Sequence, residues 1–573
     1  MRITHLAALV GCMFLFWEGV AWDARQAHAA DTPKLVVVLS VDQLSYDYLE
    51  RFSNQFSERG FFRQVAHHGA WYTECHHRHA FTLTGPGHSV IMTGTFPYRT
   101  GIIDNEWYDR EKRGQQYCVE DAQSPIVGVP RDRAELKGVS PRNLLVSTVG
   151  DSLRDATAGR GKVFGLTIKD RAAVLMAGKK PTGAFWFDSK SGMWVTSTHY
   201  RQDLPEWLKQ INHSDLVECY AGSSWRLLYD PEQYHKTAPD DSPFEGTADG
   251  NLDRSFPHAL SHESDSRYMK QLFVSPFGNE LTMRVVRQLI EGEDLGGDDV
   301  PDILTIGLSC NDFVGHNFGP HSLEVEDMTY RTDLLISEFI AYLDQRIGPG
   351  KWTLLLTADH GVTPIPEYNE LQGLPAKRNP MGQVSQFAEQ IETQLTRKFG
   401  PPRAAMRYLE ALNSNQLFLE RRSLPDEPSK KQEIREFVRD SLLKTGVFPV
   451  AYTRDELEAG ATSIRLPETY AGFVATGSDI FQMMQRTYHR DRSGDVLFVL
   501  KPYQIQTSTP ATHGSPWKPD THVPLLAIGY GIRSGRFDRP TSPAAIASTV
   551  AKLLRIDPPT TNEEQPLREA LGE

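Results

Sequence analysis

The sequence predicts an α/β protein in which helices sandwich a central, mostly parallel sheet. Three apolar runs each end abruptly in polar residues: 35–43 (LVVVLSVDQ), 302–312 (DILTIGLSCND) and 351–361 (KWTLLLTADHG). Such near-continuous runs are typical of parallel strands covered on both faces, and 522–529 (HVPLLAIG) predicts another strand of this kind. A helical stretch at 327–347 lies between two of the runs, as in folds that alternate strands and helices.

Composition narrows the class of protein. The chain has 573 residues and a formal net charge of −12, with 39% hydrophobic and 23% charged residues. These values are typical of a soluble globular protein large enough for more than one lobe. The acidic balance argues against nucleic acid as a partner. A site for an anionic small molecule must therefore be built locally, from metal ions, a few cations or a helix N-terminus.

The first 30 residues predict a secretory signal. Arg2 precedes an apolar run from Leu6 to Trp17, and Ala27-His28-Ala29 matches a small-x-small cleavage site. We expect the mature chain, 31–573, to be periplasmic or secreted. The alternative is an N-terminal membrane anchor, but the apolar run is short for a span. Since no other segment is long and apolar enough, no stable membrane insertion is expected after cleavage.

Two long stretches interrupt the strand–helix alternation, at about 171–281 and 363–504. We interpret both as insertions that form a cap over a single catalytic domain. The second contains 428–443 (PSKKQEIREFVRDSLL), predicted as an amphipathic helix with a capping box made by Ser429 and Gln432. The charged residues of this helix are expected to face solvent.

The cysteines and a histidine-rich segment offer weaker signals. An exported protein can oxidise its thiols, and Cys75 with Cys118 is one pairing among those that the sequence leaves open. No cysteine spacing indicates a zinc–thiolate site. Three histidines beside Cys75 are predicted to form a polar surface stretch, with a metal site as the less favoured alternative: His76, His77 and His79.

Acidic and histidine side chains follow the predicted strands at the point where each strand ends. Asp42 closes the first run, Asp312 the second, and Asp359 with His360 the third. In open α/β sheets, ligands bind at the carboxyl ends of the strands, so these residues are expected to converge. Taken alone, Asp42 is better explained as a turn or helix N-cap residue.

The spacing of acidic and histidine residues predicts further metal ligands. Asp312 and His316 (DFVGH) are four residues apart, so a helical turn would place both on one face, where they can bind one metal ion. The loop ATHGSPW supplies His513 before the last apolar run. Aspartate and histidine together favour zinc or a similar divalent ion.

A threonine precedes a glycine-rich turn in FTLTGPGHSVIMTG, residues 81–94. An alcohol such as Thr84 becomes a good nucleophile when a metal ion stabilises its alkoxide. Pro86 fits the first turn of a helix, whose N–H groups could hold a phosphate oxygen. Two alternatives stay open: Thr84 only caps the helix, or Thr82 is the nucleophile.

These residues together resemble the alkaline phosphatase superfamily, above all the bacterial periplasmic phosphate-irrepressible alkaline phosphatases that use a threonine nucleophile. The resemblance covers nearly the whole mature chain, and the order and spacing of its motifs make it specific. The motifs are SVDQLSYDYLERF, TLTGPGHSVIMTGTFPYRTGIIDNEWYDR, LTIKDRAAVLMAG, SCNDFVGHNFGPHS, LLLTADHGV, RSGDV and THGSPWKPDTHVPLLAIG.

The resemblance implies two Zn²⁺ ions and a set of phosphate contacts. One ion would be bound by Asp312, His316 and His513, and the other by Asp42, Asp359 and His360, with Thr84 at its open position. Asn105, Lys169 and Arg171 would contact phosphoryl oxygens, whereas the sequence alone would make Lys169 and Arg171 a basic surface stretch. His522 is expected to lie behind the ligands rather than to be one.

The implied activity is that of a zinc-dependent phosphoric monoester hydrolase that forms a covalent phosphothreonine and acts on small-molecule phosphate esters. Lys169 and Arg171 would favour monoesters, which carry more charged oxygens than diesters. One alternative is a phosphodiesterase or nucleotide pyrophosphatase on the same metal frame, and another is a non-catalytic metal- or phosphate-binding protein. A sulfatase is disfavoured because no Cys- or Ser-x-Pro-x-Arg motif occurs at Thr84. A phosphoglycerate mutase fits poorly with export.

Overall fold

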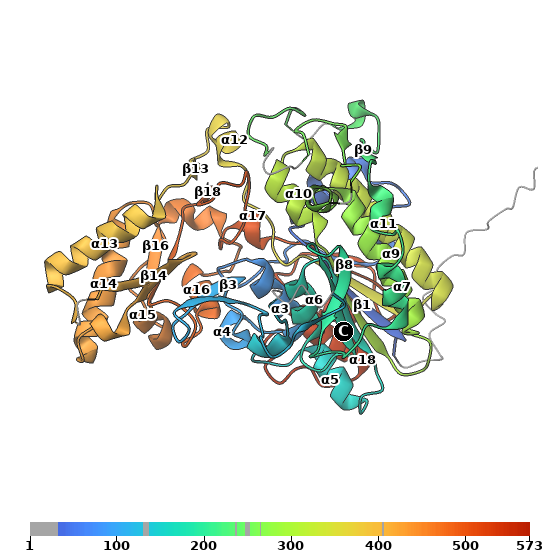
Figure 1. Ribbon diagram of the computed structural model, residues 1–573, viewed down its shortest axis with the longest axis horizontal. Coiled ribbons are helices and arrows are strands. Elements are labelled where there is room, and N and C mark those ends of the chain that lie inside the picture. Colours follow the sequence, from blue (N-terminus) through green and yellow to red (C-terminus); the bar gives the residue numbers. More distant parts are fainter. Residues whose placement is uncertain (1–31, 130–136, 235–237, 247–251, 264, 404–405) are drawn as a thin grey trace, which may run out of the picture.

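A computed structural model describes residues 32–129, 137–234, 238–246, 252–263, 265–403 and 406–573. A ten-stranded sheet forms its centre (Figure 1). The predicted α/β fold with a mostly parallel sheet is confirmed. The strands, in spatial order, are β20 (Gly535–Phe537), β2 (Ala70–Tyr72), β19 (Leu525–Gly529), β12 (Trp352–Thr357), β1 (Leu35–Val41), β11 (Asp302–Leu308), β6 (Val163–Thr167), β7 (Gly183–Asp188), β8 (Met193–Ser197) and β5 (Ile126–Val127).

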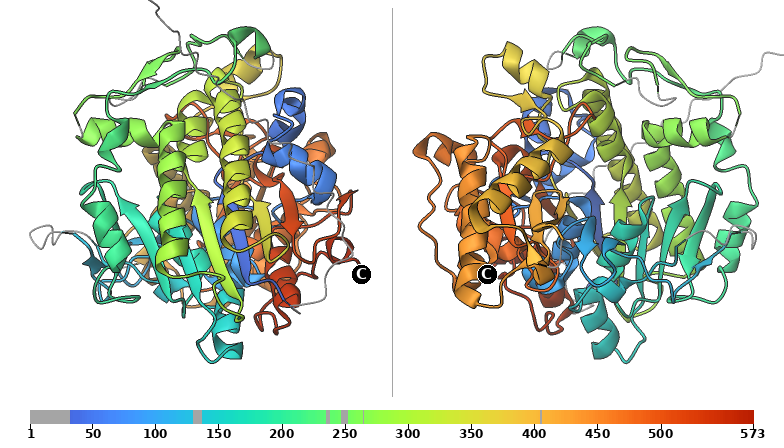
Figure 2. Two further views of the ribbon diagram at one scale, coloured as in Figure 1. Left: turned by 90° about the vertical axis from the view of Figure 1, so that its right-hand side faces the viewer. Right: turned by 60° about the vertical axis from the view of Figure 1, so that its left-hand side comes forward.

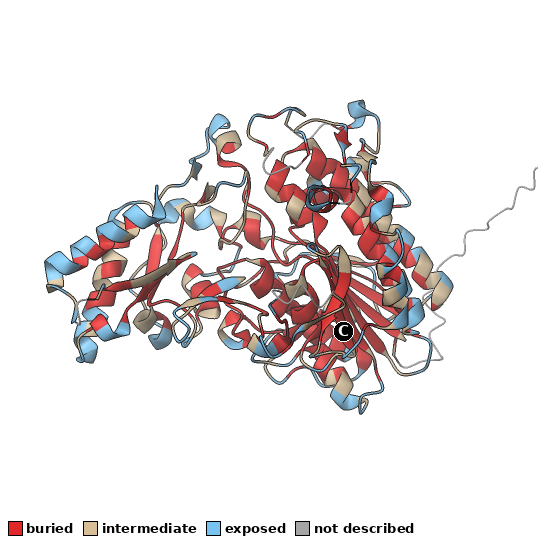
Figure 3. Cartoon of the chain, viewed as in Figure 1, coloured by how far each residue is buried: buried red, intermediate tan, exposed pale blue. Residues whose placement is uncertain are grey.

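The middle of the sheet is parallel, from β12 through β1, β11 and β6 to β7. These strands are buried on both faces, as their apolar runs predict (Figure 3). β19 differs, because it pairs antiparallel to β12. The expectation of a parallel strand at 522–529 is therefore wrong. The reason is that residues 512–524 already lie beside the carboxyl end of β12, so β19 must run back from that edge.

Helices cover both faces of the sheet (Figure 2). One layer contains α3 (Thr84–Thr93), α5 (Val149–Ala156), α6 (Asp170–Ala177) and α18 (Ala545–Leu554). The other contains α2 (Phe61–His68), α7 (Glu206–Asn212), α8 (Ser266–Phe273), α9 (Pro276–Gly292), α10 (Cys310–Phe318) and α11 (Leu323–Arg346). The helix predicted at 327–347 is confirmed, and it begins a turn earlier because Ser322 caps it by accepting a bond from the Val325 N–H.

The first predicted cap stretch, at about 171–281, is wrong over its first part. Strands β7 and β8 lie in this stretch, yet they extend the central sheet beyond β6. Their aromatic residues, such as Trp186 and Trp194, pack in the core rather than in a separate cap. The later part, with α7, α8 and the short pair β9 (Ser224–Trp225) and β10 (His258–Ala259), packs over α9 and α11.

The second predicted stretch, 363–504, contains a lobe with its own sheet (Figure 1). We call it the outer lobe. Its strands are β14 (Leu409–Asn413), β15 (Gln416–Leu419), β17 (Val496–Val499) and β16 (Val450–Thr453), covered by α13 (Val384–Phe399) and α14 (Pro428–Lys444). Alternate residues of β17 face two cores: Val496 and Phe498 pack within the lobe, whereas Leu497 and Val499 join a cluster with Phe81. The outer lobe is thereby anchored beside the segment that leads to Thr84.

The capping box predicted at Ser429 and Gln432 is wrong. α14 begins at Pro428 with Glu427 as its N-cap residue, so Ser429 lies inside the helix and forms no capping box. A proline fits the first helical position, which moves the helix start forward. The thiols of Cys75 and Cys118 are both buried and free, so the structure does not form that disulfide.

The predicted signal, residues 1–30, lies outside the described residues. Among the helices that the structure describes, none is long and apolar enough to cross a membrane.

Candidate active site

Four neighbouring parallel strands deliver the candidate residues to one edge of the central sheet. Asp42 follows β1, Asp359 and His360 follow β12, Lys169 follows β6, and Asp312 lies two residues inside α10, just after β11. Because the strands end in register, with Val41 opposite Leu308, these side chains meet at one place. The convergence predicted at the carboxyl ends of the strands is thus borne out by the geometry.

The helical turn predicted at DFVGH forms the start of α10. Asp312 and His316 lie one turn apart, with Asp312 Oδ1 3.2 Å from His316 Nε2. His316 Nδ1 hydrogen-bonds the Ala511 carbonyl at 2.8 Å, and His513 Nδ1 hydrogen-bonds the Thr82 carbonyl at the same distance. These backbone contacts orient both rings so that each Nε2 faces Asp312.

Among the described residues, two groups could each hold a metal ion, with ligand atoms all within 4.8 Å: Asp312, His360 and His513; and Asp42, Asp359 and His360. His360 reaches both groups because its ring stacks on that of His513, with centroids 3.4 Å apart. His316 lies outside the first group by this measure, although it is paired with Asp312. The six ligand residues that the sequence predicts are therefore brought together, but His360 is shared between the two groups.

The site is a buried cluster of charges. Burial, with the charge of Asp359 adding to it, raises the pKa of Asp42 to about 7. Burial would also raise the pKa of Asp312, but His316 and Lys169 outweigh it and hold that pKa well below the usual range. Burial of a carboxylate disfavours its charged form, whereas nearby cations favour it. Lys169 is equally close to both acids, so the neighbours that differ decide which acid stays ionised: Asp359 acts on Asp42, and His316 acts on Asp312.

The donor set fits divalent cations. The groups offer only carboxylate oxygens and imidazole nitrogens, which are the ligands that zinc takes in proteins. Asp42 Oδ1 is buried, lies 3.6 Å from His360 Nε2, and has no hydrogen-bond partner within the described chain. A bound cation would satisfy this oxygen. The identity of the ion remains a prediction.

Thr84 lies against this cluster and does not cap its helix. α3 begins at Thr84, its N-cap residue is Leu83, and no side chain caps the helix. Thr84 Oγ1 lies 3.5 Å from His360 Nε2 and accepts a hydrogen bond of 3.3 Å from Arg171 Nη2. The capping alternative is therefore wrong, and the hydroxyl points at the candidate ligands.

The glycines after Thr84 allow a close approach of two backbones. A Cβ atom on Gly87 would lie 2.1 Å from the Asp359 carbonyl oxygen, so only glycine lets α3 pack against the end of β12. Gly85 donates its N–H to Asn105 Oδ1 at 2.6 Å. This bond turns the Asn105 amide nitrogen away from Gly85 and leaves it as the donor available to a ligand. Pro86 is the third helical residue, close to its predicted place.

Lys169 and Arg171 belong to the site and not to a basic surface stretch, so that alternative is wrong. Lys169 Nζ lies 2.6 Å from both Asp42 Oδ2 and Asp312 Oδ2, one carboxylate from each ligand group. Arg171 Nη2 donates to Thr84, and Arg171 Nη1 donates to the Tyr117 hydroxyl at 3.5 Å. Tyr117 in turn donates to Asp170, which fixes the position of the guanidinium.

Two residues at the site were not predicted from the sequence. Gln43 Nε2 donates to Asp312 Oδ1 at 2.6 Å, and the Gln43 N–H donates to Asp359 Oδ1 at 3.2 Å. His88 Nδ1 lies 3.2 Å from Asp359 Oδ2 and 2.9 Å from the Thr84 carbonyl. Position was the available signal, since Gln43 directly follows Asp42 and His88 lies one helical turn after Thr84.

Four other histidines are not among the candidate ligands, although His77 lies next to the site, with its Nε2 3.0 Å from the Ala358 carbonyl. The surface stretch predicted for 76–79 is wrong, because all three of its histidines are buried: His76, His77 and His79. The ring of His522 stacks on Tyr46 and His76, and its Nε2 hydrogen-bonds the Thr73 carbonyl. These contacts are with Tyr46 and with residues that follow β2, and none of them is a candidate ligand, so the expectation that His522 lies behind the ligands gains no support.

Comparison with known proteins shows the family. Residues 36–509 match the family described as type I phosphodiesterase / nucleotide pyrophosphatase. The chain belongs to this family. It is 34% identical over 555 residues to "Alkaline phosphatase PafA" of Elizabethkingia meningoseptica, covering 96% of each chain. It is also 34% identical over 531 residues to "Alkaline phosphatase PhoV" of Synechococcus elongatus, covering 92% of this chain and 91% of that one.

A solved structure supports the same placement. The crystal structure of wild-type alkaline phosphatase PafA matches with a TM-score of 0.85 and 32% sequence identity, over 95% of this chain and all of that one. Membership of the alkaline phosphatase superfamily, predicted from the motifs, is confirmed. The likeness over most of the chain supports an enzyme of the phosphoric monoester hydrolase class.

Proposed function

We propose that the chain is an exported, zinc-dependent alkaline phosphatase that hydrolyses small-molecule phosphate monoesters through a phosphothreonine at Thr84. The observation that carries this proposal is the position of the Thr84 hydroxyl. It does not cap its helix, and it lies between His360 of the ligand cluster and the Arg171 guanidinium. In this position, Arg171 could hold a phosphoryl oxygen of the substrate, and the ligand cluster could hold the metal ions that activate the Thr84 hydroxyl.

Two ions would be held by the ligands that converge on the sheet edge. Asp312, His316 and His513 would hold one, and Asp42, Asp359 and His360 the other, with Thr84 beside the second group. When bound, zinc would stabilise negative charge on the attacking and leaving oxygens and lower the pKa of bound water. The 3.2 Å pairing of His316 with Asp312 supports His316 as a ligand beside the shared His360.

The residues of this chain would then position the phosphoryl group of the substrate for two successive displacements. The Thr84 oxygen attacks phosphorus, the bond from phosphorus to the ester oxygen breaks, and the alcohol leaves with a proton. Water next attacks phosphorus, phosphate is released, and Thr84 regains its proton. Arg171 and the Asn105 amide would hold phosphoryl oxygens in both steps, because both face Thr84 or its helix start.

Lys169 would favour monoesters over diesters. Its ammonium is buried, and burial lowers its pKa, but Asp312 and Asp42 outweigh burial and raise the pKa, so the group stays charged. A monoester has one more charged non-bridging oxygen than a diester. A buried cation beside Arg171 stabilises that additional charge in a site of low dielectric constant.

A second candidate, hydrolysis of phosphodiesters, is favoured by the family match to type I phosphodiesterases. Measurement of kcat/KM on an aryl phosphate monoester and the corresponding diester separates the two. We expect a monoester preference that is lost on chelation and restored by zinc, and 32P-labelling of Thr84 after acid quench. The double variant Lys169→Ala/Arg171→Ala should lose far more monoester than diester turnover. A diester preference in the unmodified enzyme would contradict the proposal, and equal losses in the double variant would contradict the role of the two cations.

A further inference from the structure

A cavity of about 650 Å³ opens directly beside the candidate active site. It lies where both predicted cap stretches meet α10: one wall comes from residues 243–246 and α8, another from Glu367, Arg378 and residues 508–510. His316 forms part of its lining. Cavities of this size that combine apolar walls with a few polar groups are typical of small-molecule sites. His316, a candidate metal ligand, is thus also part of the wall of a cavity large enough for a small molecule.

Three phenylalanines form the aromatic part of the cavity lining: Phe244, Phe273 and Phe313. Phe313 lies between the site and the cavity, with its ring centroid 5.0 Å from Lys169 Nζ. On its other side it stacks with Phe273, with centroids 5.8 Å apart and ring planes inclined by 20°. Phe273 is held edge-on against Phe187 of β7, so the aromatic wall rests on the central sheet.

The charged groups on the far wall are already paired. Both oxygens of Glu367 accept from Arg378, at 2.7 and 2.9 Å. Arg378 also donates to the carbonyls of Thr507 and Pro510, at 3.1 and 2.8 Å. Since the guanidinium is committed to this loop, the wall is suited to a planar neutral group more than to a second phosphate.

The position of the cavity fits the leaving group. In-line displacement places the leaving oxygen opposite the attacking one. Thr84 lies beside His360, whereas His316 is paired with Asp312 on α10 and opens into the cavity. The alcohol part of a substrate would therefore extend past His316, along Phe313 and Phe273.

We propose that this cavity binds the alcohol part of the substrate and selects phosphate monoesters whose leaving group carries a planar aromatic ring. Phe313, Phe273 and Phe244 would be the residues that determine specificity, through stacking and edge contacts with that ring. The inference rests on the proposed phosphatase function, because it names the substrate class of the same site.

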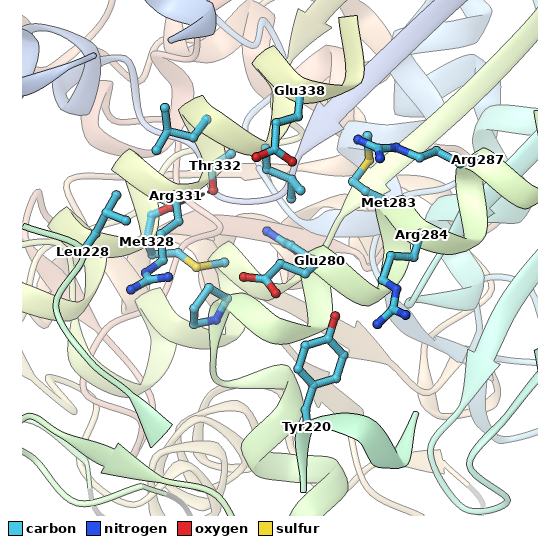
Figure 4. Close-up of a pocket in the computed structure, with 14 residues that line it drawn as sticks. Tyr220, Leu228, Glu280, Met283, Arg284, Arg287, Met328, Arg331, Thr332 and Glu338 are labelled. Atoms are coloured by element: carbon cyan, nitrogen blue, oxygen red, sulfur yellow. Dashed lines mark hydrogen bonds between the residues drawn. The ribbon is translucent and has the colours of Figure 1, made fainter. Parts of the chain in front are cut away.

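A second cavity, of about 560 Å³, provides the contrast (Figure 4). It lies between α9 and α11 and is lined by charged side chains such as Arg284, Arg331 and Glu280, with Tyr220 as its aromatic residue. None of the candidate ligands, Thr84 or the phosphate-contacting residues lines it. Tyr220→Leu therefore removes an aromatic ring from a comparable space outside the active site, and serves as the matched control.

The test compares benzyl phosphate with cyclohexylmethyl phosphate, two esters of primary alcohols of similar size that differ in ring planarity. We expect the unmodified enzyme to show a kcat/KM about three- to tenfold higher for the benzyl ester, the size of an aromatic contact. Phe273→Leu and Phe244→Leu should each bring this ratio close to one. The ratio is taken within one variant, so a general loss of activity does not disturb it. Tyr220→Leu should keep the ratio of the unmodified enzyme.

A binding measurement provides a second readout. Calorimetric titration of the Thr84→Ala variant with both esters should give tighter binding of the benzyl ester, and the added Phe273→Leu change should remove the difference. Adenosine 5′-monophosphate against ribose 5-phosphate distinguishes a nucleobase from a simple aryl ring as the preferred occupant. Ethyl phosphate reports the phosphatase function itself. An enzyme that hydrolyses ethyl phosphate but treats the ring pair alike overturns the cavity assignment only, whereas one that hydrolyses none of the esters overturns both proposals.

Discussion

The carboxyl edge of the central sheet and the solvent-facing surface of α13 in the outer lobe both hold short ion pairs, but in opposite surroundings. At the sheet edge, Lys169 lies 2.6 Å from Asp42 and from Asp312, and the side chains of all three are at most 5% exposed. In the outer lobe, Arg407 lies 2.7 Å from Glu389, yet these side chains are 55% and 63% exposed. Distance alone would make the pairs equivalent.

The difference teaches that burial, not proximity, decides what a charge pair does. An exposed pair gains little, because water and salt screen it. A buried pair has lost its hydration, so removal of one partner leaves an uncompensated charge in the core. The charges buried at the sheet edge are those that the proposed function would use, whereas α13 and α14 of the outer lobe carry many charged residues on their solvent-facing sides (Figure 3). Changes at the edge should therefore alter activity, and changes in the outer lobe should alter little.

The largest effect is expected at Thr84. Thr84→Ala removes the oxygen that would form the bond to phosphorus, so kcat/KM for a monoester should fall by at least about 10³-fold. The thermal unfolding midpoint should hardly move, since the Thr84 side chain does not cap α3. Both are measured on the same preparation, by phosphate release and by circular dichroism.

Thr82→Ala is the matched control for that change. The Thr82 hydroxyl donates to the Ser515 carbonyl at 2.8 Å, and alanine keeps the backbone carbonyl that bonds His513, so loss of the hydroxyl should leave most of the turnover intact. Full activity in Thr84→Ala together with an inactive Thr82→Ala would instead identify Thr82 as the nucleophile.

A smaller loss is expected at Gln43, which touches both ligand groups without being a ligand. Gln43→Ala removes the bond from its amide to Asp312, and loss of such a supporting bond costs about 10- to 100-fold in metal affinity or activity. The backbone at position 43 has a positive φ of 65°. Glutamine and alanine both carry a Cβ atom, so the substitution does not change the conformational strain. Zinc affinity by competition with a chelator, with kcat/KM alongside, measures the effect.

Gln64→Ala supplies the comparison for Gln43. Gln64 Nε2 bonds the Arg59 carbonyl and the Ser337 hydroxyl, both at 2.8 Å, on the outer side of the helical layer. If both variants keep the zinc affinity of the unmodified enzyme, Gln43 does not position Asp312.

Much of the fold and the site could be predicted from the sequence, and the failures have a common cause. Strands β1, β11 and β12 and the acids after them were predictable because a strand buried on both faces needs a continuous apolar run, and the polar residue marks its end. The antiparallel direction of β19 was not, because an apolar run has no direction. The sequence does not separate strands β7 and β8 from a cap, because their tryptophans also suit an irregular segment.

The site residues also divide into those that a local sequence pattern marks and those that it does not. Asp312 and His316 were predictable from helical spacing. The assignment of Lys169 and Arg171 needed the family resemblance, because two basic residues close together in sequence usually face solvent. Gln43 and His88 could be suspected from their positions, beside Asp42 and one helical turn after Thr84. Their contacts with the candidate ligands come from distant segments, 269 to 316 residues away in the case of Gln43, and no local pattern records these hydrogen bonds.

Asp333 sharpens the comparison, because it is buried like the sheet edge but forms no ion pair among the residues that the structure describes. It accepts a hydrogen bond of 2.7 Å from the Phe62 N–H, and burial raises its pKa to about 7. The folded protein therefore retains a proton that the unfolded chain releases near pH 4. Stability should fall as pH rises from about 4 to about 7, by about 2 to 4 kcal/mol in the free energy of unfolding.

Asp333→Asn should remove the contribution of Asp333 to that fall, because asparagine keeps the acceptor and cannot ionise. Urea denaturation at pH 5 and pH 8 should show the variant gaining on the unmodified protein at the higher pH. Asp538→Asn, a change at an exposed position, should follow the unmodified protein at both values. A constant difference between Asp333→Asn and the unmodified protein would show that Asp333 is ionised in the fold.

The smallest effect is expected in the outer lobe, where Arg407→Ala removes the exposed pair with Glu389. Both side chains are more than half exposed, so the free energy of unfolding should change by less than about 0.5 kcal/mol. The change should shrink further in 0.5 M salt, because screening acts fully on exposed charges. Urea denaturation at low and high salt measures it, with monoester turnover expected to stay constant. A loss above 1 kcal/mol, or a loss of turnover, would mean that distance rather than burial sets the worth of a pair in this protein, and the contrast between the two regions would not hold.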